Sequence, residues 1–151
     1  MIREFERYVE KGQAFVQAFA AAIGEENLRK ASEVLERVFA AMRQHLPFHE
    51  SVNVMECLPM AIRGLYMNGW TLSGGSQRLT TTDSFVREIA QADDHEAEAE
   101  AVDVAKAAIE TIAEFSAGLD RLPKGLRNLY QALARVSRRD DSLFFDRFTF
   151  Q

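Results

Sequence analysis

The sequence contains a single cysteine, Cys57, and only three prolines and eight glycines in 151 residues. One cysteine excludes an internal disulfide, and this predicts a protein of the reducing cytoplasm. Few prolines and glycines leave little material for the many turns of an all-β fold, so long helices are favoured. The most apolar segment, residues 15–23, is far shorter than the roughly 20 residues that span a bilayer.

Positive charge is also scarce, because 18 Lys and Arg residues face 23 Asp and Glu residues. The net charge is −5 and the isoelectric point about 5.3. A mildly acidic chain lacks the basic surface that nucleic-acid-binding proteins use, and anionic membranes repel it weakly. We therefore expect neither a nucleic acid nor a membrane as a partner.

Apolar residues recur at steps of three and four, which is typical of amphipathic helices. Pro47 and Pro59 should each start a helix, because proline lacks the amide hydrogen that a continuing helix needs. The pattern predicts helices over residues 2–23, 25–45, 47–57, 59–68 and 94–115, with a further helix starting at Thr82 or Asp83.

The segment LPMAIRGLYMNGW, residues 58–70, has a second copy of its first nine residues in LPKGLRNLY, residues 122–130. Upstream of each copy the apolar residues also match, with Phe85-Val86 following Phe15-Val16 by 70 positions. Matching registers of this kind indicate an internal duplication.

The duplication predicts an all-α bundle of about eight helices, built from two tandem halves related by a pseudo-two-fold axis. The halves are residues 13–70 and 82–130, joined by a Gly-rich connection at 71–81 and followed by a Phe-rich extension at 131–151. A half of about 60 residues would be marginal alone, so we expect one domain over residues 1–151.

The segment at residues 58–70 resembles the signature of a bacterial family, domain of unknown function 2267. The resemblance covers about residues 13–130. Met67 stands where a second tyrosine is common, and the N-terminal extension and the Phe-rich tail are extra. The resemblance implies an all-α fold and no established activity, so it supplies no catalytic residue. The residues in register are Leu58, Pro59, Arg63, Gly64, Leu65, Tyr66, Gly69 and Trp70.

Five residues are candidates for binding: Arg63, Tyr66, Trp70, Arg127 and Tyr130. The two arginines hold equivalent places in the repeat. Each could bond a carboxylate or the free carbonyls at a helix end, or the pair could form an anion site between the halves. The aromatic residues could line a pocket or could edge the core with their polar tips bonded to backbone. Trp70, beside the connection, is the best candidate for a ligand contact.

The C-terminal extension holds a candidate interface made of Phe144, Phe145, Phe148 and Phe150. These side chains could pack on their own domain or on a second subunit. The acidic stretch at 93–103 and the basic stretch at 121–139 could likewise be solvated faces or could meet between subunits.

No metal site or cofactor is expected. His45 and His49 have the spacing of metal ligands on one helix, but Pro47 lies between them and should break that helix. No nucleophile motif is present, and Cys57 should be buried and inert.

These patterns favour a non-catalytic helical interaction or ligand-binding module that forms a homodimer in the cytoplasm. The alternative is a small-molecule-binding protein or enzyme that uses a pocket between the halves, with Arg63, Arg127 and Trp70 as contacts.

Overall fold

The computed structural model describes residues 1–71, 78–91 and 94–149, with side chains described as far as residue 137. Within these ranges every regular element is a helix, which confirms the predicted all-α class. The elements are α1 (Arg3–Ile23), α2 (Leu28–His45), α3 (Phe48–Glu56), α4 (Met60–Met67), α5 (Thr82–Ala90), α6 (His95–Glu114), the 3-10 helix η1 (Leu119–Arg121) and α7 (Lys124–Thr149).

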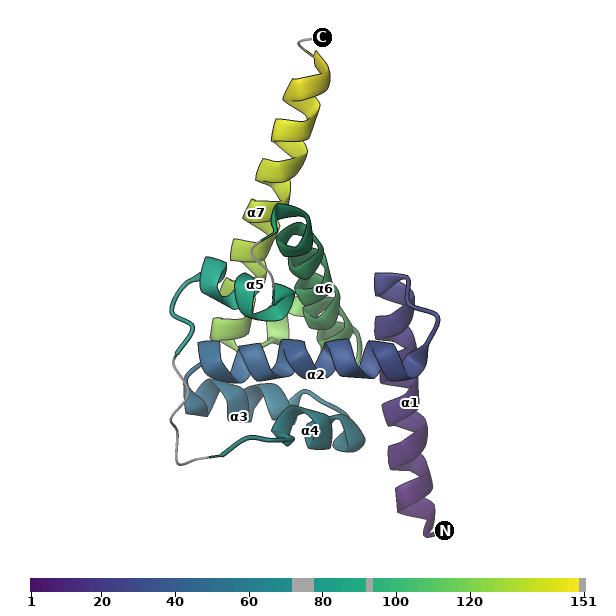
Figure 1. Cartoon of the computed structure of the whole chain (residues 1–151). Helices are drawn as coiled ribbons and strands as arrows, with labels where there is room; N and C mark the ends of the chain where they lie inside the picture. The colour runs from purple at the N-terminus through teal and green to yellow at the C-terminus, as the bar shows by residue number, and fades with distance from the viewer. Residues whose placement is uncertain (72–77, 92–93, 150–151) are drawn as a thin grey trace.

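Helix α2 crosses the middle of the molecule (Figure 1). Helices α3 and α4 lie on one side of it, α5 and α6 on the other, and α1 packs across its end (Figure 1). The buried side chains of α2 and α6 supply much of the core. The buried face of α6 is rich in alanine, which lets neighbouring helices approach closely.

The helix starts follow from capping. Pro47 and Pro59 occupy the N-cap positions of α3 and α4, and Pro123 directly precedes α7, as the Leu-Pro pattern predicts. The predicted start of the second helix at residue 25 is wrong. The Asn27 side chain accepts hydrogen bonds from the amides of Arg29 and Lys30, so α2 begins three residues later.

Two close contacts join helices that are distant in the sequence. A Cβ atom at Gly12 would lie 2.8 Å from that of Ala61, so glycine is what allows α1 to touch α4. The amide of Gly125 donates to Glu50 Oε2 over 3.1 Å, so a carboxylate on α3 caps the first turn of α7.

Helix α7 continues without a break past residue 131, where the predicted C-terminal extension begins. In the second half of the repeat, the region that aligns with α3 forms only the short 3-10 helix η1. The predicted interface residues Phe144, Phe145, Phe148 and Phe150 lie outside the part of the chain whose side chains are described.

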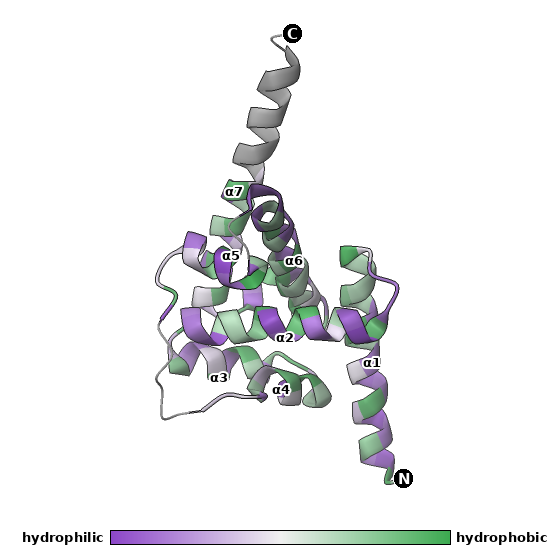
Figure 2. Cartoon of the chain, viewed as in Figure 1, coloured by the Kyte–Doolittle hydropathy of each residue, from purple (hydrophilic) through white to green (hydrophobic). Residues whose placement is uncertain are grey.

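The first turns of α1 extend past the neighbouring helices (Figure 1), and residues 1–11 are all exposed. Hydrophobic residues recur along this free end (Figure 2). None of the described helices is both long and apolar enough to cross a membrane.

Candidate functional site

Trp70 is held where α2, α3 and α4 meet. Gly69 takes a positive φ of 76°, and the Trp70 amide donates to the carbonyl of Met67 over 2.9 Å. This turn folds the chain back, so the half-buried indole packs 5.4 Å from the Phe48 ring and edge-on to Tyr66 at 6.2 Å between ring centroids. The structure therefore brings the predicted residues Tyr66 and Trp70 together.

Arg43 of α2 lies over this aromatic cluster, with its guanidinium carbon 5.9 Å from the centre of the Trp70 ring. Its Nε and Nη1 atoms are buried and have no hydrogen-bond acceptor among the described residues. Burial lowers the pKa of Arg43, although the group keeps its charge near neutral pH. Buried donors without an acceptor are uncommon in proteins.

Sequence reasoning missed Arg43. The available signal was its position, four residues after Phe39 and three before Leu46, which places a charged residue on the apolar face of α2.

Tyr66 is fully buried, and its hydroxyl lies 2.9 Å from the Ser51 hydroxyl, which is also buried. The bond joins α3 to α4. Burial raises the pKa of Tyr66 to about 12, against the smaller opposing effects of the Ser51 hydrogen bond and the Arg43 charge. The phenol is therefore neutral at physiological pH and serves as a hydrogen-bonding group in the core.

The two repeated arginines have different surroundings. Arg63 Nε donates to the carbonyl of Leu58 over 3.0 Å, and Nη2 reaches the carbonyl of Glu56 at 3.5 Å. Arg63 thus closes the C-terminal end of α3, which is the structural role weighed for it. Arg127 is exposed on α7.

Tyr130 differs in the same way from its counterpart Tyr66. It is half-buried on α7, and burial together with the neighbouring Glu110 carboxylate raises its pKa. Arg127 and Tyr130 therefore belong to the α6–α7 part of the molecule, whereas Arg63, Tyr66 and Trp70 belong to α4 and its end.

The histidines do not converge. His45 Nδ1 donates to the carbonyl of Leu79 over 2.6 Å, and the Leu79 amide donates to the carbonyl of Gln44 over 3.1 Å. These two bonds hold Leu79, which lies shortly before α5, against the C-terminal end of α2. His49 lies on α3 beyond Pro47, with its side chain 76% exposed. Among the described residues, no three His, Cys, Asp or Glu side chains are placed to hold a metal ion.

Hollows on the described surface that lie away from the aromatic cluster include two between helices. A hollow of about 150 Å³ is lined by residues of α2, α5 and α6. Another, of about 190 Å³, is lined by residues of α5, α6 and α7. Both are smaller than the ~300–1,000 Å³ typical of ligand pockets. Neither is lined by any of the five predicted binding residues.

The chain has no match among curated proteins. The model of one family, described as an uncharacterized conserved protein (DUF2267), matches residues 12–133. That range includes α2 to α6, both Leu-Pro segments and the cluster around Trp70. The chain therefore belongs to the DUF2267 family, as the segment at residues 58–70 predicted.

Proposed function

We propose that the chain is a non-catalytic helical interaction module that associates with itself. The observation that carries this proposal is where its exposed apolar side chains lie. Ten large hydrophobic side chains are exposed among those that the structure describes, and five of them fall within the first nine positions: Met1, Ile2, Phe5, Tyr8 and Val9. Exposed apolar residues scattered singly are ordinary, whereas a group of them on one short segment marks an interaction surface.

The state of the polar groups supports a non-catalytic role. Ser51 and Thr111 are buried and already hydrogen-bonded, Ser51 to Tyr66 and Thr111 to the carbonyl of Ala107. A serine or threonine hydroxyl acts as a nucleophile when it lies within reach of a base and of substrate. Neither of these hydroxyls has that arrangement.

Sedimentation velocity over a hundredfold range of concentration tests self-association. The proposal predicts a monomer–dimer equilibrium, and a sedimentation coefficient that stays at the monomer value throughout would overturn it.

We also infer that the two halves are related by a pseudo-two-fold axis. Phe15 packs on Phe115 with ring centroids 5.2 Å apart, and Phe85 packs on His45 at 5.6 Å. Position 85 follows position 15 by 70 residues, and position 115 follows position 45 by the same number. Exchanging the two halves therefore turns the contact between positions 15 and 115 into the contact between positions 85 and 45. Reciprocal contacts of this kind are what a two-fold relation between duplicated halves produces.

Arg43 supports a second candidate function, the binding of a small oxyanion such as phosphate or a carboxylate. Its buried Nε and Nη1 have no acceptor among the residues that the structure describes, and Trp70 and Tyr66 lie beside it. Calorimetric titration with inorganic phosphate tests this role. Binding that Arg43→Gln abolishes and Arg127→Gln preserves would support the role, and no heat of binding to the unaltered protein would exclude phosphate.

A further inference from the structure

We propose that the free end of α1 is the surface through which the molecule associates, with residues 2–9 of one chain packed against the same residues of a second copy. This inference rests on the proposed function and deepens it, because it names the surface and the partner.

The stripe of α1 that packs inside the molecule continues into the free end without a break. Gly12 and Phe19 are buried in the second part of the helix. In the first part Ile2 is 57%, Phe5 53% and Val9 45% exposed. Alternating steps of three and four are the spacing at which two helices pack along each other, so the uncovered part lacks only a second helix. The stripe consists of Ile2, Phe5, Val9, Gly12, Val16, Phe19 and Ile23.

The charges beside the stripe favour a second copy as the partner. Residues 3–11 carry three acids and three bases, whereas the whole chain carries a net charge of −5. Helices that lie on membranes are rich in Lys and Arg on their polar face, and this segment has no such excess. A neutral segment is where two acidic chains can meet with the least repulsion, and the second copy brings an identical stripe. The charged residues are Arg3, Glu4, Glu6, Arg7, Glu10 and Lys11.

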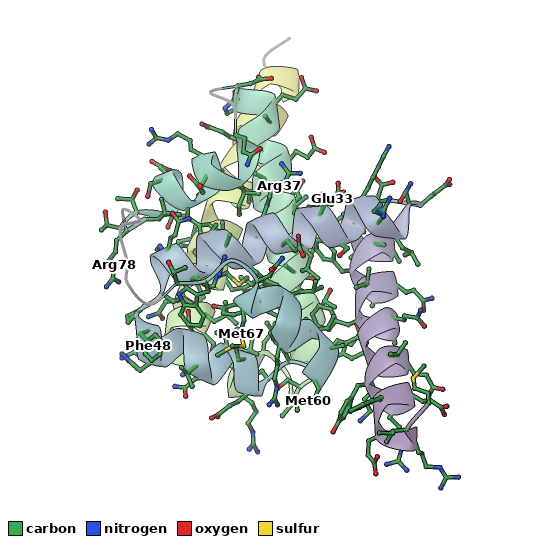
Figure 3. The ribbon with its side chains drawn as sticks, turned by 60° about the horizontal axis from the view of Figure 1, so that its bottom comes forward. Glu33, Arg37, Phe48, Met60, Met67 and Arg78 are labelled. Carbon is green, nitrogen blue, oxygen red and sulfur yellow. The ribbon has the colours of Figure 1, made fainter. Side chains whose placement is uncertain are left out.

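Met60 of α4 is a further exposed apolar residue, next in the sequence to the contact between α4 and α1. Met60 directly precedes Ala61, which touches Gly12, and its side chain is half exposed on the face that Figure 3 turns forward. The family match starts at residue 12, so the free end is an addition to the part that the family model covers. The eight residues 2–9 give a seam of only ~12 Å at 1.5 Å per residue. We therefore expect a weak dimer with a dissociation constant of about 1–100 µM.

The test compares three full-length proteins by sedimentation velocity: the unaltered chain, Phe5→Ser/Val9→Ser and Glu10→Ser/Lys11→Ser. Both double variants keep the net charge and place two serines on the same exposed helix, but only the first removes the stripe. We expect the first to weaken dimerisation about 100-fold and the second to change it less than about threefold. Circular dichroism should give the same helical content for all three, because these side chains do not pack in the core.

The outcomes separate the two proposals. An unaltered chain that stays monomeric overturns both of them. A chain that dimerises equally well with Phe5→Ser/Val9→Ser keeps its self-association but overturns the surface named here, and loss on Phe144→Ser/Phe148→Ser would then move the interface to the C-terminal extension. Cosedimentation of the monomer with vesicles of phosphatidylcholine and phosphatidylserine, lost on Phe5→Ser/Val9→Ser, would replace the second copy with a lipid surface.

Discussion

At the scale of single residues, the buried bond between Tyr66 and Ser51 shows why a polar pair can persist in an apolar core. Each hydroxyl satisfies the other over 2.9 Å, so neither is left without a partner. Tyr66→Phe alone leaves the Ser51 hydroxyl unpaired, and we expect it to cost about 1–3 kcal/mol of unfolding free energy. Adding Ser51→Ala removes the orphaned group and should recover part of that loss. Urea unfolding of the single and double variants measures both, and an equal loss in the two would contradict the account.

The raised pKa of Tyr66 also sets a pH dependence. The folded protein holds the phenolic proton more tightly than the unfolded chain, whose tyrosines ionise near 10, so stability from this group is complete below about pH 10 and is lost as pH rises toward 12. The stability difference between the unaltered protein and Tyr66→Phe/Ser51→Ala should therefore shrink over that range. Urea midpoints at several alkaline pH values measure it, and a constant difference would show that Tyr66 ionises normally.

Arg63 and Arg127 offer a matched pair, because one is bonded and the other exposed at equivalent places in the repeat. Arg63→Met leaves the carbonyls of Leu58 and Glu56 without their donor and should lower unfolding free energy by about 1–2 kcal/mol. Arg127→Met should stay within about 0.5 kcal/mol of the unaltered protein. Thermal denaturation compares them, and equal losses would mean that Arg127 has a structural role of its own.

At the scale of elements, the contact between α1 and α4 depends on Gly12. Gly12→Ala would gain helix propensity but would force its Cβ to within 2.8 Å of the Ala61 Cβ, so we expect a net loss of about 1–3 kcal/mol. Ala61→Gly added to it should restore most of the stability, because the methyl group then sits on the other helix. A double variant no more stable than Gly12→Ala would show that the contact is not the cause.

Helix positions were largely predictable from the sequence, because apolar periodicity and proline mark them locally. Contacts between elements were not. Glu50 and Gly125 are 75 residues apart, and nothing in their spacing indicates that one caps the other. Tyr66 and Tyr130 hold equivalent places in the repeat, but their surroundings differ. In the first half, Ser51 of α3 bonds the Tyr66 hydroxyl. In the second half only η1 stands in the place of α3, so no helix there carries an equivalent of Ser51. The position of Arg43 beside Trp70 was not predictable, because the sequence does not show which aromatic rings pack over a charged residue on the apolar face of a helix.

At the scale of the whole molecule, salt distinguishes two ways in which acidic chains could associate. Pairing through the neutral free end of α1 buries apolar side chains, so 0.5 M sodium chloride, about three times physiological ionic strength, should leave the dissociation constant within about threefold of its low-salt value. Pairing of the acidic stretch at 93–103 with the basic stretch at 121–139 would weaken markedly under the same conditions. Sedimentation at low and high salt measures the difference, and a marked loss in high salt would favour the charged stretches.

The position of Trp70 has a practical consequence for following such experiments. It is the only tryptophan in the chain, and it sits among Arg43, Phe48 and Tyr66. Selective excitation of the indole therefore reports the environment of one junction, with no label attached. A red shift in its emission while circular dichroism stays constant would mean that α4 has come away from α2 before the helices themselves melt.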